Sequence, residues 1–213
     1  MESDINQDWP NLKRYEDENQ NLGPPKKNEN RVVFLGDSIT EGWSSLNPSY
    51  FEEKSYINRG IGGQTTPQML IRFKQDVVDL KPSVVVILAG TNDIAGNTGP
   101  SNVKMITDNI FSMATIAESH GIKVVLSSIL PVYKYEWSPE IIDPPSTIDA
   151  VNKKLKKHAE VNEFEYLDYF TKMVDNKKGL KQELTTDGVH LNEKGYILMS
   201  SIAERKLKSI LRF

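Results

Sequence analysis

The sequence predicts an α/β protein, a three-layer α/β/α sandwich around a five-stranded parallel sheet. Three apolar runs rich in valine and isoleucine have the composition of strands that are buried on both faces, which is typical of parallel sheets. These runs alternate along the chain with helical patterns, which indicates strand–helix–strand units. Because crossovers between parallel strands are right-handed, such units place helices on both faces of the sheet.

Five segments are the candidate strands. The strongly apolar runs are VVFL at 32–35, VVVILA at 84–89 and IKVVLSSI at 122–129, and the weaker candidates are YIN at 56–58 and EYLDY at 165–169. Between and after them, apolar residues recur three or four positions apart and so form one face of a helix. Four such stripes are present: Leu70, Phe73, Val77 and Leu80; Val103, Ile106, Ile110, Met113 and Ala117; Ile148, Val151, Leu155 and Ala159; and Leu198, Ile202, Leu207 and Ile210. We expect these residues to pack in the core.

The 213-residue chain is expected to comprise a polar arm and linker at residues 1–30 and one domain at residues 31–213. One short helix is expected in the arm, at 11–19. The net charge is −3 and the Lys and Arg residues are scattered, so no nucleic-acid partner is expected. No apolar run approaches the roughly 18–20 residues of a membrane span. The absence of cysteine excludes disulfides and Cys-ligated zinc.

The first residues, MESDINQDWP, lack the apolar core of a signal peptide. We expect either an exported protein, periplasmic or secreted, whose signal peptide is absent from this sequence, or a cytoplasmic protein. The sequence indicates no oligomeric state.

Small, polar and glycine-rich residues follow three of the predicted strands. These segments are GDSIT at 36–40, NRGIGGQTT at 58–66 and GTNDIAGNTG at 90–99. Such residues are ordinary in turns, so that each segment alone is a weak signal. In a parallel sheet, however, the carboxyl ends of the strands share one edge, where ligands bind. The sequence therefore predicts a functional site at this edge.

Ser38 follows the first strand and is the candidate nucleophile, which requires a base such as histidine. The chain has three histidines. His120 precedes a glycine that we expect to end a helix, and His158 lies in a lysine-rich helix that we expect to be solvated. His190 lies in a loop, in the segment TTDGVH, with Asp187 three residues earlier. This spacing allows the Asp187 carboxylate to reach Nδ1 of His190, which leaves Nε2 to face the serine.

Acyl transfer also needs donors for the charge that develops on the carbonyl oxygen. The backbone N–H groups near Gly60, Gly62 and Gly63 are candidates, because glycine permits a close approach of the backbone. The side chain of Asn92 and the N–H of Ser38 are further candidates.

The segments GDSIT, GIGG, GTND and DGVH, in this order and at suitable intervals, resemble the four signature blocks of the SGNH hydrolases, also called GDSL-type esterases and lipases. The resemblance extends from about Arg31 to the C-terminus. GDSITEGW together with NRGIGGQTT is most similar to the platelet-activating-factor acetylhydrolase-like branch. The resemblance implies the SGNH hydrolase fold, which is flavodoxin-like, and a serine esterase that needs no metal and no cofactor.

The resemblance implies Ser38 as nucleophile, His190 as general base and Asp187 as the residue that orients His190. It implies an oxyanion hole made by the N–H groups of Ser38 and Gly63 and by the Asn92 side chain.

Gly63 is favoured over Gly62 because the family's glycine usually precedes the acidic residue of this block directly, although that position here is Gln64. Asp37 and Asp93 lie inside the motifs and are interpreted as structural acceptors of backbone N–H groups.

The long segment 130–146 follows the fourth strand and should overhang the same edge. Its aromatic residues Tyr133, Tyr135 and Trp137 are predicted to wall a substrate pocket, or alternatively to fix the loop to the surface. No long apolar lid is present, which favours short acyl groups such as acetyl on carbohydrate. Hydrolysis of lysophospholipids or aryl esters is the alternative substrate class.

Two other functions are compatible with this fold. One is a flavodoxin-like module that binds a flavin or phosphate ligand, although it leaves Asn92 and the Asp187–His190 pair without a role. The other is a catalytically inactive scaffold, which is disfavoured because every position that the chemistry needs is filled.

Overall fold

The structure confirms the predicted parallel sheet of five strands. The computed structural model describes residues 8–52 and 54–211. The strands are β1 (Val32–Gly36), β2 (Tyr56–Gly60), β3 (Val84–Leu88), β4 (Lys123–Ser127) and β5 (Glu165–Leu167). Their order is β2-β1-β3-β4-β5, and each neighbouring pair is parallel. Strand β2 lies on one side of β1, and the later strands β3, β4 and β5 follow on the other side. Sheets of this kind have a crevice at the carboxyl ends of the two strands where the order reverses, here β1 and β3.

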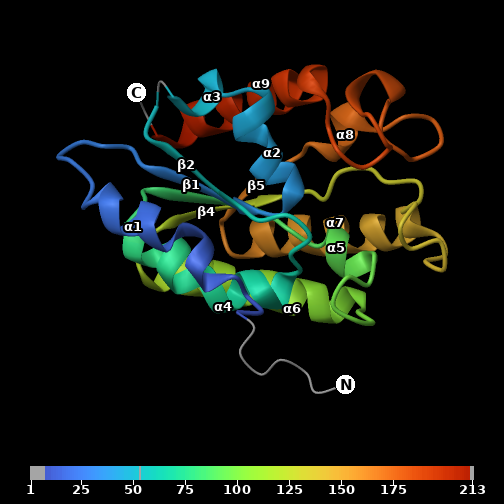
Figure 1. Ribbon diagram of the computed structural model, residues 1–213, viewed down its shortest axis with the longest axis horizontal. Helices are drawn as coiled ribbons and strands as arrows, with labels where there is room; N and C mark the ends of the chain where they lie inside the picture. The colour runs from blue at the N-terminus through green and yellow to red at the C-terminus, as the bar shows by residue number, and fades with distance from the viewer. Residues whose placement is uncertain (1–7, 53, 212–213) are drawn as a thin grey trace.

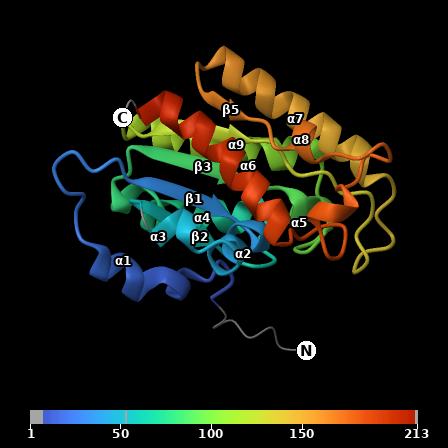
Figure 2. The same cartoon turned by 90° about the horizontal axis from the view of Figure 1, so that it is seen from above.

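Helices cover both faces of the sheet, as predicted (Figures 1 and 2). One face carries α2 (Ser38–Leu46), α3 (Ser49–Glu52), α8 (Phe170–Met173) and α9 (Glu193–Leu211). The other face carries α4 (Thr66–Asp76), α5 (Thr91–Ile94), α6 (Val103–Ser119) and α7 (Pro144–Val161). Three short 3-10 helices complete the described elements: η1 (Leu12–Tyr15), η2 (Val78–Leu80) and η3 (Gln182–Leu184).

The alternation of side chains along each strand divides the core between the two faces. In β1, Val33 and Leu35 pack toward α4, α6 and α7, whereas Val32 and Phe34 pack toward α2 and α9. All four side chains are almost fully buried. The apolar run that follows Arg31 is therefore explained by a central strand with a helix layer on each side.

Three predicted elements end earlier than the apolar pattern does. Helix α4 ends at Asp76, and Leu80 belongs to η2, which ends before Lys81 in the left-handed region at φ 50°. Strand β4 ends at Ser127, and at Ile129 the backbone pairs with a side chain instead of a strand, because Asn152 bonds both the N–H and the C=O of Ile129. Strand β5 ends at Leu167 because Asp168 then accepts the N–H of Thr171 at the start of α8.

The described part of the arm packs against the domain through η1 and α1 (Glu16–Leu22). Tyr15 is buried and its hydroxyl donates to the backbone oxygen of Gly60, at the end of β2. The Arg59 side chain donates to Asn19 and pairs with Glu18. These contacts fix the arm beside β2 and α4, whereas the domain boundary at Arg31 stays a prediction. No helix among the described residues is both long and apolar enough to cross a membrane.

Candidate active site

Ser38 is the first residue of α2 and lies directly beyond the end of β1. Gly36 allows this tight connection, because a Cβ there would lie 2.1 Å from Oγ1 of Thr40 and 2.9 Å from the backbone oxygen of Leu88. Asp37 caps the helix, as its Oδ1 accepts the N–H of Ile39 at 2.9 Å. The sequence Gly36-Asp37-Ser38 thus turns a buried strand into a helix and presents the serine at the carboxyl edge of the sheet.

The fold brings Ser38, His190 and Asp187 together, although 152 positions separate the serine from the histidine. Oγ of Ser38 lies 3.0 Å from Nε2 of His190, and Nδ1 of His190 lies 2.7 Å from Oδ2 of Asp187. The other carboxylate oxygen of Asp187 accepts the N–H groups of Val189 and His190. Thr185 donates to the backbone oxygen of His190 and accepts the N–H of Gly188, and these bonds hold the loop that carries Asp187 and His190 in place.

The environment keeps the Asp187 carboxylate ionised. Partial burial raises its pKa, but the hydrogen bonds from the His190 side chain and from the N–H groups of His190 and Val189 outweigh burial and lower the pKa. A carboxylate beside Nδ1 holds the imidazole in the tautomer whose Nε2 accepts a proton. The arrangement can therefore withdraw the hydroxyl proton from Ser38.

Asp37 and Asp93 accept backbone N–H groups, which confirms their structural interpretation. Asp93 accepts the N–H and the hydroxyl of Thr66 at the start of α4. Burial raises the pKa of Asp93, and burial raises the pKa of Asp37 to about 7.

The raised pKa of Asp37 gives a prediction for stability. Because the folded protein favours the protonated carboxyl, protonation of Asp37 stabilises the folded state. This contribution to the free energy of unfolding is complete below the unfolded pKa near 4 and is lost as the pH rises to about 7. An asparagine in place of Asp37 would still cap α2 but would not titrate. The unfolding free energy of Asp37→Asn, relative to that of the unsubstituted protein, should rise between pH 4 and 7 by up to about 1.4 kcal/mol per pH unit. Urea unfolding across this range measures it, and a constant difference would contradict it.

The loop after β2 distinguishes between the two candidate glycines. The N–H of Gly62 donates to Oε2 of Glu41 at 2.8 Å. The N–H of Gly63 has no acceptor among the described residues, and Gly63 has the positive φ of 74° that favours glycine. The Ser38 N–H likewise has no protein acceptor in the described chain, as expected at the start of a helix. This geometry favours Gly63 over Gly62 as a donor to a substrate.

Asn92 is buried in α5 and its amide orientation is fixed from both sides. Its Nδ2 donates to the backbone oxygen of Gln64 at 3.0 Å, which leaves a second N–H, and its Oδ1 accepts Nδ2 of Asn97 at 3.1 Å. Nδ2 of Asn97 also donates to the backbone oxygen of Gly63. Asn97 therefore ties Asn92 to the Gly63 loop.

The three predicted aromatic residues occupy different environments. Trp137 is half-exposed, its ring centre lies 6.3 Å from that of His190, and its Nε1 donates to Asn97. Tyr133 is exposed and lies beside Gly179, so that its place in a substrate wall stays a prediction. Tyr135 requires a correction: it is only 1% exposed and its hydroxyl bonds Thr91. Tyr135 is a core residue that supports the loop and cannot contact a substrate.

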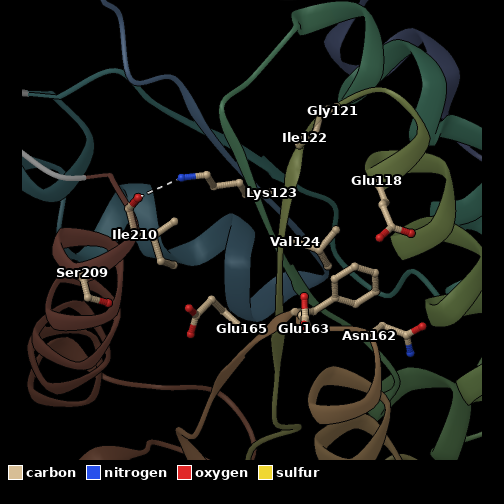
Figure 3. Close-up of a pocket in the computed structure, with 11 residues that line it drawn as sticks. Glu118, Gly121, Ile122, Lys123, Val124, Asn162, Glu163, Glu165, Ser209 and Ile210 are labelled. Atoms are coloured by element: carbon tan, nitrogen blue, oxygen red, sulfur yellow. Dashed lines mark hydrogen bonds between the residues drawn. The ribbon is translucent and has the colours of Figure 1, made fainter.

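Two of the hollows in the described part of the chain lie at opposite ends of the sheet. One, of about 610 Å³, is lined by Gly62, Gly63, Asn97 and Trp137 and by residues of the arm. A larger one, of about 800 Å³, lies at the amino ends of β4 and β5, where the Lys123 side chain bonds the backbone oxygen of Ile210 (Figure 3). Only the first hollow contains residues of the candidate site. No cluster of metal-ligating side chains is present in the part of the chain that the structure describes.

The sequence reasoning missed several residues that shape this site. Asn97 lies in the same glycine-rich segment as Asn92, so its side-chain amide was a visible signal. Glu41 holds the N–H of Gly62, and its position three residues after Ser38, on the first turn of α2, was a weaker signal. The contacts of the arm with the domain could not be predicted, because they join a polar segment without a recognisable pattern to residues far away in the sequence.

A serine hydroxyl, an imidazole and a carboxylate linked in series, here at the carboxyl edge of a parallel sheet, form the arrangement that nucleophilic acyl transfer requires. The model of the GDSL-like lipase/acylhydrolase family matches residues 34–198, and the chain belongs to this family. This confirms the resemblance found in the motifs.

Solved structures and curated proteins agree with the family. A GDSL-like lipase from Bacteroides thetaiotaomicron VPI-5482 is 42% identical, with a TM-score of 0.93, over 95% of this chain and 99% of that one. The uncharacterized lipoprotein YqeF of Bacillus subtilis (strain 168) is 39% identical over 47% of this chain and 49% of its own length, so this match spans about half of that relative. An arylesterase from Vibrio mimicus is 28% identical over 75% of this chain and 79% of its own.

A shorter match reflects the predicted branch. The alpha2 subunit of human platelet-activating factor acetylhydrolase IB is 37% identical over 32% of this chain and 31% of its own length.

Proposed function

We propose that the protein is a serine esterase that cleaves carboxylic esters through an acyl-enzyme. The observation that carries the proposal is the 3.0 Å contact between Oγ of Ser38 and Nε2 of His190, continued to Asp187. Ser38 attacks the ester carbonyl while His190 takes its proton, and the imidazolium is stabilised by the Asp187 carboxylate. The oxyanion is held by the N–H groups of Ser38 and Gly63 and by the free N–H of Asn92.

The second half of the reaction repeats these steps with water. Collapse of the tetrahedral intermediate breaks the bond to the alcohol, which leaves with the proton from His190. His190 then removes a proton from water, and the resulting hydroxide adds to the acyl group on Ser38. Release of the carboxylic acid returns the proton to the Oγ of Ser38. No metal or cofactor takes part in this proposed cycle.

The substrates that we propose are short acyl esters, above all acetyl esters of carbohydrate. The hollow beside Gly63 is lined mainly by polar side chains, which suits a hydroxylated alcohol better than a fatty chain. Aryl ester hydrolysis is the second candidate, favoured by the similarity to the Vibrio mimicus arylesterase. We also propose that the protein is exported, since the relative YqeF is a lipoprotein.

Covalent trapping and a series of esters test this proposal. Diethyl p-nitrophenyl phosphate should transfer its diethylphosphoryl group to Oγ of Ser38 and release p-nitrophenol. Mass spectrometry of peptides should then find the added mass on Ser38 and on no other serine. Among p-nitrophenyl esters from acetate to decanoate, kcat/KM should be highest for acetate. Labelling elsewhere would contradict the nucleophile, and a preference for decanoate would contradict only the substrate.

A further inference from the structure

We propose that the N-terminal arm forms one wall of the substrate site, and that Trp9 and Trp137 together hold the carbohydrate part of the ester. This inference rests on the proposed esterase function. Both tryptophans line the hollow of about 610 Å³, a volume typical of small-ligand sites. Trp9 is 47% exposed and Trp137 is 46% exposed, so each presents an aromatic surface to solvent.

The arm is held in place at Trp9 by the domain itself. Nε2 of Gln68 donates to the backbone oxygen of Trp9 at 2.7 Å, and Nε2 of Gln64 donates to that of Pro10 at 2.7 Å. Gln64 is buried, and its oxygen in turn accepts Nε of Arg72. The Trp9 indole is thus positioned by backbone contacts that do not depend on its own side chain.

The hollow is continuous with the groups proposed to bind the reacting carbonyl. Gly62 and Gly63 line it and also form the candidate oxyanion loop. Trp137 lines the hollow and also approaches the imidazole, since its ring centre lies 6.3 Å from that of His190, and its Nε1 donates to Asn97. Ser38 itself does not line the hollow, but a Cβ built on Gly62 would lie 3.8 Å from Cβ of Ser38, so that an ester group extending past Gly62 reaches the serine.

The chemistry of the lining favours a neutral, hydroxylated ligand. Its uncharged polar side chains are those of Asn11, Gln64, Gln68, Asn97, Thr98 and Ser138, of which Gln64 and Gln68 already bond the arm and Asn97 already bonds Gly63 and Asn92. The described lining residues include no Lys or Arg to pair with a phosphate, and Ile61 is the single aliphatic side chain among them. The carboxylate of Asp8 already accepts the N–H of Lys13. Indole faces pack against the C–H face of a sugar ring, while uncharged polar side chains such as those of Asn11 and Ser138 bond its hydroxyls. This lining disfavours a phospholipid headgroup or a long acyl chain.

The test compares two esters in each variant. For Trp9→Ala, the ratio of kcat/KM for acetylated xylotriose to kcat/KM for p-nitrophenyl acetate should fall about tenfold, because stacking on the indole is lost only for the sugar. Trp9→Phe should restore most of the ratio. Leu46→Ala is the control: Leu46 is equally exposed at 46%, lies at the end of α2 and does not line the hollow.

Binding without turnover separates this inference from the esterase proposal. In a Ser38→Ala background, acetylated xylotriose should change the fluorescence of Trp9 and Trp137, since the third tryptophan, Trp43, is buried. The change should be smaller in Ser38→Ala/Trp9→Ala. An unaltered ester ratio in Trp9→Ala, or a loss at Tyr133→Ala instead, overturns the subsite while leaving the esterase intact. Full turnover by Ser38→Ala would overturn the esterase proposal, independently of any sugar binding.

Discussion

Replacing Ser38 with alanine should reduce the turnover of p-nitrophenyl acetate by at least about 10³-fold, as expected when a nucleophile is removed from a coupled set of catalytic groups. Among the described residues the hydroxyl forms one side-chain hydrogen bond, with Nε2 of His190. Its loss should therefore leave the fold intact, and circular dichroism and thermal unfolding check this. The measurement is kcat at saturating ester, corrected for spontaneous hydrolysis.

The histidines supply the control for this prediction. His190→Ala should cost about as much as Ser38→Ala, and the double variant should be no worse than either, because the two groups act as a unit. His120→Ala should leave turnover unchanged, since His120 is exposed at the end of α6 and bonds the backbone oxygen of Ile116. Additive losses in the double variant would show that Ser38 and His190 act independently, contrary to the proposed mechanism.

The fold could be predicted because its signals are local. Runs of valine and isoleucine define β1, β3 and β4, and apolar stripes define α6, α7 and α9. Where the elements end could not be predicted equally well, because tertiary contacts replace the strand pairing there, as the Asn152 side chain does at Ile129 after β4. The expectation that His158 is solvated holds only in part, because its ring is partly buried and stacks on Phe111, a contact between α6 and α7 that a lysine-rich sequence pattern does not reveal.

The site could be predicted only where the motifs carry chemistry. Ser38, Asp187 and His190 could be named because each is a reactive residue type in a turn-like setting, and the parallel sheet explains why they meet. Tyr135 was misassigned because a loop position gives no information on whether an aromatic side chain points inward. Trp9 was not predicted to lie near the site, because a polar terminal segment shows no sequence pattern that indicates packing against the domain.

A second large effect, on stability, is expected on replacing Arg72, which lies beneath the candidate site in the protein interior. The side chain is 0% exposed and forms four hydrogen bonds: Nε to Gln64, Nη1 to Asp76, and Nη2 to the backbone oxygens of Gly36 and Arg59. It thus joins the carboxyl ends of β1 and β2 to the loop that carries Gly63. An arginine in this sequence context is expected at an exposed helix position, so its role could not be predicted.

Arg72→Met should lower the free energy of unfolding by about 3–5 kcal/mol, because it leaves the buried Asp76 carboxylate without its cation and removes the charged donors to Gln64 and to the backbone oxygens of Gly36 and Arg59. Asn19 still donates to Asp76, but a neutral amide does not replace the charge. Arg72→Lys should recover only part of the loss, since an ammonium group cannot reproduce the planar fork that reaches four acceptors. Arg72→Met/Asp76→Leu should be more stable than Arg72→Met alone, because no unpaired charge remains buried. Urea unfolding followed by circular dichroism measures all three variants. A loss below about 1 kcal/mol for Arg72→Met, the range of an exposed ion pair, would mean that water reaches this cluster and that the two strand ends are held by the sheet alone.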